Sequence, residues 1–226
     1  MTRIFVFMHA RMVYAAAVLL FPALLWSASV VSDPSIDGGP GAVAPGVAAY
    51  EAGDYARAHD LLKPAAEAGD IQARYLMARL LSGDLADRTD YQQAFAYLDA
   101  KTRCFSVDAL NFYANAMLRY HGEERYTILV EAIEIYKEAA GAGSIKALFN
   151  MGLTITKNMR KPVLGASYVY EAAEKGDPQG LQIIKRIKAD HSGDIALARI
   201  RKLVREQPFE VRWPALTSFS RQCPAF

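Results

Sequence analysis

Cysteine and tryptophan are scarce in this chain of 226 residues, with two of each, and histidine is almost as rare, with four. The two cysteines, Cys104 and Cys223, lie far apart, whereas zinc-binding cysteines come in pairs at short spacing. The four histidines include no His-Glu-x-x-His arrangement, which excludes that class of zinc protease. We therefore expect no metal site.

The sequence motifs of common enzyme classes are missing too. It contains no Gly-x-Ser-x-Gly nucleophile elbow, no Walker loop and no glycine fingerprint for dinucleotides. Its densest glycine cluster, Gly38–Gly41, is interrupted by proline and does not follow a strand-like segment. We expect no enzymatic activity, no catalytic residues and no cofactor.

An excess of charge of either sign is also absent. The 26 Lys and Arg residues nearly balance the 24 Asp and Glu residues, and the formal net charge is +2. Proteins that hold nucleic acid neutralise many phosphates with a broad positive field. Nucleic acid is therefore not an expected partner. The composition, 52% hydrophobic and 22% charged, is typical of a chain that buries a core.

A short apolar run lies near the N-terminus. Val13–Trp26 has no charged residue and is shorter than the roughly 20 residues that span a bilayer. It follows Arg3 and Arg11 and precedes small residues, the order typical of a secretory signal peptide. We interpret 1–32 as that signal, which predicts a periplasmic or secreted protein. The alternative is an uncleaved anchor that holds the protein to the inner membrane, facing the periplasm; only then is a membrane contact expected.

One short phrase recurs along the chain. Ala-Ala-x-x-Gly followed by Asp or Ser occupies 65–70, 139–144 and 172–177, with starts 74 and 33 residues apart. The longer spacing is about two periods, which predicts a degenerate copy at Lys101–Ser106, where Phe105 replaces the glycine. Alanine lets helices approach, glycine ends a helix in the left-handed conformation, and Asp or Ser caps the next one. Each copy predicts a tight turn between two helices.

A family resemblance follows from the helical pattern around these phrases. Ala-x-Tyr-x-Met-Ala-x-x-Leu at 73–81, followed by 82–94 and the recurring phrases, resembles Sel1-like repeats over roughly 47–185. The resemblance implies an all-α fold, an α/α solenoid of about four Sel1-like helix-turn-helix repeats related to tetratricopeptide arrays, whose usual work is protein binding. The pattern departs from the family at 101–126 and 156–165, where repeat boundaries stay open.

The domain organisation follows from these signals. Proline and glycine break both helix and strand periodicity after the signal, which predicts a flexible linker over 33–45. The repeat solenoid is expected over 46–190, and 191–226 forms a separate C-terminal part. Within it, the basic amphipathic segment Gly193–Glu206 predicts a capping helix. Phe209–Phe226, which is aromatic and rich in proline, predicts an extended strap that packs back.

The cysteines are the candidate disulfide of this exported chain. In an oxidising compartment an even pair can close, and a loop of about 120 residues would stabilise the fold by roughly 4–5 kcal/mol in the chain-entropy model. The bridge between Cys104 and Cys223 would strap the tail to the middle of the chain. Two free cysteines are the alternative.

The candidate binding groove comes from helix geometry. The first helix of each solenoid pair lines the concave face, so positions i, i+3 and i+7 form a stripe. Arginine, asparagine and aromatic side chains suit the carbonyls, carboxylates and apolar anchors of a peptide. The alternatives are packing for Tyr75 and Phe149, and solvation for Arg79 and Arg119. The predicted groove residues are Gln72, Tyr75, Arg79, Asn111, Asn115, Arg119, Lys146 and Phe149.

These observations predict an exported scaffold or adaptor, monomeric on its own, that holds a protein or peptide partner in the cell envelope. One alternative is a structural subunit of an envelope complex that docks through its C-terminal tail. Another is a hydrolase that acts on the cell wall.

Overall fold

The fold is known from a computed structural model. The structure describes residues 43–83, 85, 89–121, 126–190, 193–213 and 222–223. The predicted signal, 1–32, and most of the predicted linker lie outside these ranges. Within them the regular structure is α-helical with no strand, apart from an isolated antiparallel bridge between Ser82 and Thr89. The all-α prediction is confirmed for this part of the chain.

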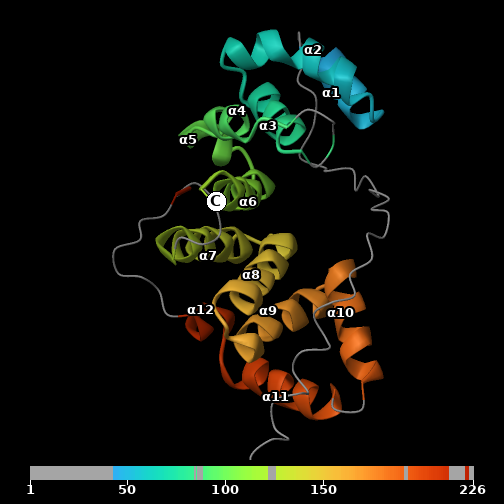
Figure 1. Ribbon diagram of the computed structural model, residues 1–226, viewed down its shortest axis with the longest axis vertical. Coiled ribbons are helices and arrows are strands. Elements are labelled where there is room, and N and C mark those ends of the chain that lie inside the picture. The colour runs from blue at the N-terminus through green and yellow to red at the C-terminus, as the bar shows by residue number, and fades with distance from the viewer. Residues whose placement is uncertain are drawn as a thin grey trace, which may run out of the picture. The chain divides into compact units, whose positions relative to one another are not determined.

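The described residues contain twelve helices. They are α1 (Ala44–Glu51), α2 (Tyr55–Glu67), α3 (Ile71–Leu81), α4 (Tyr91–Tyr97), α5 (Ala100–Arg103), α6 (Val107–His121), α7 (Tyr126–Gly141), α8 (Ile145–Asn158), α9 (Pro162–Glu174), α10 (Pro178–Ala189), α11 (Gly193–Glu206) and α12 (Phe209–Arg212). Figure 1 shows α1, in blue, to α11, in orange-red, following one another in chain order, whereas α12 is drawn next to α9. Among these helices, none combines the length and the apolar character needed to cross a membrane.

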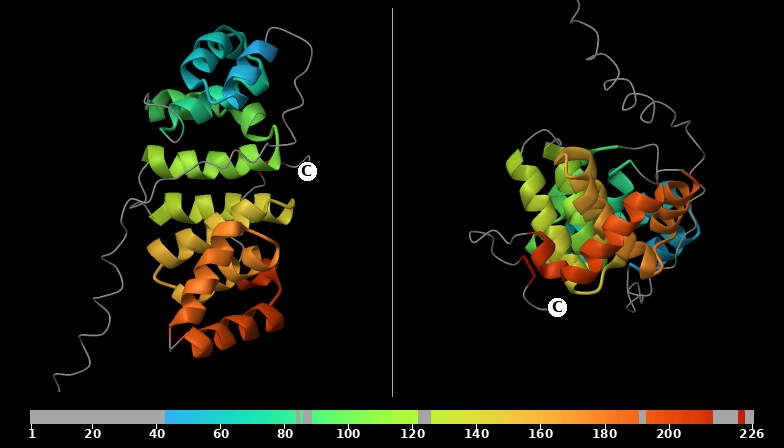
Figure 2. Two further views of the ribbon diagram at one scale, coloured as in Figure 1. Left: turned by 90° about the vertical axis from the view of Figure 1, so that its right-hand side faces the viewer. Right: turned by 90° about the horizontal axis from the view of Figure 1, so that it is seen from below.

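Packing is mostly between neighbours in the chain. From α1 to α4 and again from α6 to α11, each helix contacts the next, and α4 contacts α6 directly. Contacts also join α1 to α3, α6 to α8 and α9 to α11, so some helices touch their second neighbour as well. Figure 2 shows the resulting succession of helix layers. The core is therefore built mostly from segments that are close in sequence.

The recurring phrase forms the predicted turn at each of its three copies. Its glycine has a φ between +94° and +106°, the left-handed region that favours glycine. The side chain of the next residue accepts a hydrogen bond of 2.7 to 3.2 Å from a main-chain N–H in the first turn of the following helix. The pairs concerned are Gly69–Asp70, Gly143–Ser144 and Gly176–Asp177.

The degenerate copy at Lys101–Ser106 turns the chain differently. Phe105, in the glycine position, does not adopt a positive φ. The helix is interrupted earlier instead, because α4 ends at Tyr97 and Asp99 caps the short α5 by accepting two main-chain hydrogen bonds. A β-carbon makes the left-handed conformation unfavourable, which explains why a chain without the glycine bends at another point.

Two glycines bring α8 and α9 close together. A β-carbon on Gly152 would lie 2.7 Å from the carbonyl oxygen of Gly165, and one on Gly165 would lie 2.6 Å from that of Gly152. Either distance is shorter than a van der Waals contact. The close approach of the two helices therefore depends on glycine at both positions.

The C-terminal boundary elements agree in part with the prediction. Leu197 and Ile200 of α11 form a cluster with Ala173 and Ile184, as expected for a helix that covers the end of the array. Phe209–Arg212, however, forms the helix α12 where an extended strap was predicted. The rest of that strap, apart from 213 and 222–223, lies outside the described residues.

The N-terminal boundary differs slightly from the prediction. Helix α1 begins at Ala44, so the last two residues of the predicted linker, 33–45, are helical. Pro45 lies in the first turn of α1, where a missing N–H leaves no helix hydrogen bond unmade. A proline that suggested a linker is thus compatible with a helix start.

Candidate functional site

Four helices that each follow a turn between helices form a connected row. Arg119 of α6 donates a hydrogen bond of 2.9 Å to the carbonyl oxygen of the C-cap residue of α3. Asn150 of α8 donates one of 2.9 Å to the side chain of Asn111 of α6. Lys146 of α8 donates one to the side chain of Gln179 of α10. We call α3, α6, α8 and α10 the first-helix row.

One stripe of the first-helix row faces solvent. On α8 it consists of Lys146, Asn150, Leu153 and Lys157, which recur at i, i+4, i+7 and i+11 and are all exposed or partly exposed. These are the second, sixth, ninth and thirteenth residues after the cap. The exposed stripe continues through the equivalent positions Gln72 and Arg79 of α3; Asp108, Phe112, Asn115 and Arg119 of α6; and Gln179, Ile183 and Arg186 of α10.

The predicted groove residues divide between this stripe and the core. Gln72, Arg79, Asn115, Arg119 and Lys146 lie on the exposed stripe. Tyr75, Asn111 and Phe149 each take the fifth position after the cap and are only 2%, 7% and 4% exposed. The residue one position later is partly exposed on α6 and α8, because a step of one residue rotates a side chain by about 100°. Burial assigns these three residues to packing rather than to the surface.

Aromatic contacts hold the α3 end of the stripe. Tyr75 packs edge-on against Phe112 of α6, with ring centroids 6.0 Å apart. The Arg79 guanidinium lies 5.4 Å from the ring centroid of Tyr50 and 5.8 Å from that of Tyr75. The positive charge of Arg79 is therefore placed by two rings of the core.

A chain of hydrogen bonds fixes the centre of the stripe. Tyr136 of α7 donates its hydroxyl proton to the side-chain oxygen of Asn115 at 2.8 Å. The amide nitrogen of Asn115 donates to the carbonyl oxygen of Asn111 at 3.1 Å, and Asn111 in turn accepts from Asn150. The hydroxyl of Tyr136 and the main-chain carbonyl of Asn111 thus orient the Asn115 amide, and the side chain of Asn111 joins α6 to α8.

Lys146 lies where α8 meets α10. Its ammonium group is 4.9 Å from the ring centroid of Phe149 and donates a hydrogen bond to Gln179. Partial burial lowers the pKa of Lys146, and the nearby carboxylate of Asp177 opposes that shift. The position of this charge is thus set by neighbours on both helices.

Acidic residues of α7 hold the C-terminal segment. Trp213 donates its indole N–H to Glu134 at 2.9 Å. One turn later, the two carboxylate oxygens of Glu138 accept the main-chain N–H groups of Gln222 and Cys223 at 2.8 and 2.7 Å. The segment is therefore fastened at two points to one helix.

Helix α9 and the disulfide complete this attachment. Arg212 is buried, donates a hydrogen bond of 3.1 Å to the hydroxyl of Ser167 and forms an ion pair with Glu171. Cys104 and Cys223 lie at disulfide distance, with their Cα atoms 5.4 Å apart. We call these contacts of Arg212, Trp213, Gln222 and Cys223 the C-terminal clamp.

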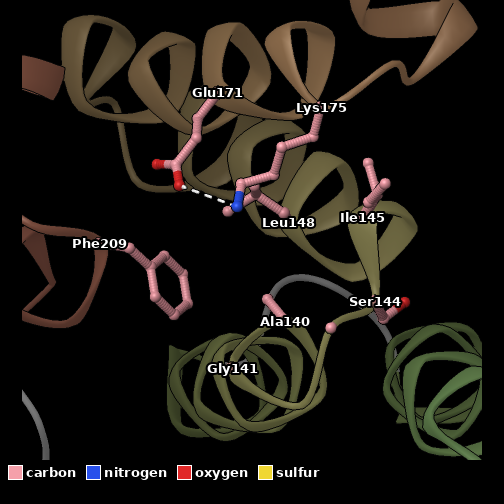
Figure 3. A pocket seen from close by; sticks show the side chains of 9 residues that line it. Ala140, Gly141, Ser144, Ile145, Leu148, Glu171, Lys175 and Phe209 are labelled. Carbon is pink, nitrogen blue, oxygen red and sulfur yellow. Dashed lines mark ion pairs between the residues drawn. The ribbon is translucent and has the colours of Figure 1, made fainter.

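A cavity of about 520 Å³ lies beside the C-terminal clamp, between α7, α8, α9 and α12. Figure 3 shows Phe209 of α12 on one side and Ile145 and Leu148 of α8 on the other. Glu171 and Lys175 project from α9, and their charged groups pair at 3.9 Å. The volume of the cavity is within the range of small-molecule sites. The two charged side chains that line it, Glu171 and Lys175, already pair with each other.

The clamp partners are functional neighbours that sequence reasoning missed. The sequence of the tail predicted that it packs back but did not indicate which residues receive it. Glu134 and Glu138 recur at i and i+4 on a largely apolar helix, and this was the available signal. An acidic residue on the buried side of a helix needs a partner, and Trp213 is that partner for Glu134.

Comparison with models of known protein families, with curated proteins and with solved structures finds no match to this chain. Over the described ranges, His, Cys, Asp and Glu form no group of three or more that could hold a metal ion. The features that bear on function are therefore the first-helix row and the C-terminal clamp.

Proposed function

We propose that this chain is an exported Sel1-like scaffold, an α/α solenoid that holds a protein or peptide partner in the cell envelope. Four helix pairs support the repeat interpretation, namely α1–α2, α3–α4, α6–α7 and α8–α9; α10 follows them, and the capping helix α11 packs against it. Contacts limited mainly to neighbours are the defining property of solenoids.

The single observation that carries the proposal is the repetition of the exposed stripe. Equivalent positions on α6, α8 and α10, and the second and ninth positions of α3, are exposed or partly exposed, and hydrogen bonds connect the helices in that order. A surface assembled from one stripe per repeat is continuous across the repeats, and it can contact an extended segment of a partner at several points. We assign it no catalytic role.

Export is supported by the disulfide. Disulfides persist in oxidising compartments such as the periplasm and are rare in the cytosol. The pairing of Cys104 with Cys223 is compatible with the signal proposed at 1–32. The alternative of docking through the C-terminal tail is less favoured, because Trp213 and Cys223 are buried against this chain's own helices.

Site-specific photo-crosslinking in the native cells tests the proposal. A photoreactive amino acid replaces Leu153 on the exposed stripe in one variant and Leu61 on α2 in the other. The two leucines are matched, with residue exposures of 39% for Leu153 and 36% for Leu61. We expect a discrete higher-mass adduct from the Leu153 position and none from the Leu61 position.

The opposite results are equally informative. Adducts of the same mass and yield at both positions would mean that contact is not confined to the stripe. No adduct at Leu153, with the variant present at normal abundance and correctly folded, would contradict a partner on the first-helix row.

A further inference from the structure

Charge is segregated between the helices of the array. Helices α3, α8 and α10 contain no Asp or Glu, and the acidic residue of α6 is Asp108. The chain as a whole is close to neutral, with a net charge of +2. The first-helix row is nevertheless strongly basic, since it carries Arg74, Arg79, Arg119, Lys146, Lys157, Lys185, Arg186 and Lys188.

Within the helices, most acidic residues lie outside the first-helix row, on α2, α7, α9 and α11, and several of them serve the C-terminal clamp. Glu134 and Glu138 of α7 accept hydrogen bonds from the C-terminal segment, and Glu171 of α9 pairs with Arg212 and Lys175. The carboxylates of α7 and α9 therefore bind the C-terminal segment of the chain itself. The helices that carry the exposed stripe have a marked excess of positive charge, and the capping helix α11 has a smaller one.

The exposed stripe presents this positive charge to solvent. Arg119, Lys146, Lys157 and Arg186 are exposed on it, and Arg79 is partly exposed. The hydrogen bonds of Arg119 and Lys146 to neighbouring helices orient their charged groups across the row. An opposite charge that approaches this face meets several positioned cations together, which steers and strengthens binding.

Uncharged groups alternate with these cations. Asn115 and Asn150 place carboxamides on the stripe, and Phe112, Leu153 and Ile183 place apolar groups there. Carboxamides pair with the main-chain groups of a peptide, and apolar groups receive its hydrophobic side chains. A surface that attracted only a simple polyanion would need neither kind.

We infer that the exposed stripe binds an extended, acidic peptide segment of the partner; this rests on the proposed function and names the chemistry of its ligand. Packed helices lie about 8–10 Å apart, and an extended chain advances about 3.3 Å per residue. A segment that crosses the first-helix row therefore meets a new helix about every third residue. Carboxylates at that spacing match the cations best.

The probe is a fluorescein-labelled peptide of about ten residues, with Glu at every third position and Asn, Ala and Leu between. Its binding to the purified, oxidised protein is followed by fluorescence anisotropy at low and at high salt. We expect binding that weakens as salt increases, because exposed ion pairs are screened. The same peptide with Gln in place of Glu is expected to bind at least about tenfold more weakly.

Charge reversal locates the binding face. The double variant Lys146→Glu, Arg186→Glu should lose about tenfold or more in affinity, because two attractions become repulsions. Its matched control is Lys63→Glu, Lys188→Glu, which changes the net charge equally. Lys188 lies about 200° around α10 from Arg186, and Lys63 lies on α2. The control should bind the acidic peptide as the wild-type protein does.

Folding of the variants is checked by circular dichroism and thermal melting. Since Lys146 contacts Gln179, its reversal can disturb α8 and α10. If the double variant is destabilised, the single variant Arg186→Glu, changed at an exposed site, replaces it and should still weaken binding of the acidic peptide severalfold. Equal binding by this variant and by Lys188→Glu would contradict the inference.

The remaining outcomes separate the inference from the proposed function. No binding of the acidic peptide, together with a discrete adduct at Leu153, would overturn the acidic ligand and leave the scaffold standing. Absence of both would count against both. Equally tight binding of dextran sulfate would show a general attraction for anions and would overturn the peptide assignment.

Discussion

Trp213 donates its indole N–H to the carboxylate of Glu134 at 2.9 Å, across 79 residues of sequence. Both residues are 5% exposed, and Lys137, which lies on α7 with Glu134, donates a hydrogen bond to the carbonyl oxygen of Trp213. A buried carboxylate without a hydrogen bond is costly, so this contact determines where the chain after α12 can pack.

The Trp213–Glu134 bond is tested by Trp213→Phe. The change keeps an aromatic ring but leaves the buried carboxylate without its donor, and we expect a loss of about 1–3 kcal/mol. Urea unfolding of the oxidised protein measures it. Glu134→Gln is the control, since its side-chain oxygen still accepts the bond and a smaller loss is expected. Unchanged stability of Trp213→Phe would contradict the assigned role.

Reduction of the disulfide is expected to destabilise the whole described array. The bridge joins residues 119 positions apart, and the chain-entropy model assigns about 4–5 kcal/mol to a loop of that length. The measurement is the urea midpoint with and without reductant. In a Cys104→Ser, Cys223→Ser variant the reductant should have no effect. A wild-type midpoint that is insensitive to reductant would show that the bridge adds nothing.

Two glycines in one turn should respond oppositely to alanine. Gly143 has a φ of +106°, so Gly143→Ala is expected to cost about 1–2 kcal/mol through backbone strain. Gly141 is the last residue of α7, and Gly141→Ala should stabilise by about 0.4–1 kcal/mol. A β-carbon at either site meets no atom within 4 Å, so contacts do not confuse the comparison. Equal thermal shifts in both variants would contradict the turn geometry.

Acid should weaken the junction of α3 and α5. Burial raises the pKa of Asp99, but the main-chain N–H of Thr102 and the charge of Arg74 outweigh it, and the pKa lies below its usual value. Because the pKa of Asp99 is lower in the folded than in the unfolded protein, ionised Asp99 stabilises the fold. This contribution is fully present above the unfolded-state pKa and is lost as pH falls through the folded-state pKa. Thermal melting between about pH 2 and 5 measures the loss. Asp99→Asn keeps a capping side chain and should show a shallower decline; curves of equal slope would contradict this.

The clamp also determines how a role for the tail must be tested. Truncation before Pro208 removes the contacts of Arg212 and Trp213 together with the Cys104–Cys223 bridge. A shortened chain that fails to bind would therefore report loss of stability as readily as loss of a docking segment. Substitutions on the exposed stripe avoid this difficulty because they leave the clamp intact.

The turns between helices could be predicted because their causes are local. In Gly143–Ser144, a glycine that tolerates a positive φ is followed by a hydroxyl that caps the next helix, and both effects act within a few residues. The cations of the exposed stripe were also visible in sequence, since Arg79, Arg119 and Lys146 follow helical spacing from the caps.

Tertiary structure decided what depends on distant neighbours. Helical spacing alone did not separate the fifth position after each cap, where Tyr75 and Phe149 are buried, from the sixth, which is partly exposed on α8. Neither did it show that Glu134 receives Trp213. Local sequence sets where a helix starts and which residues share a face, whereas burial and long-range hydrogen bonds depend on which other helix arrives there, and that is settled only when the chain packs.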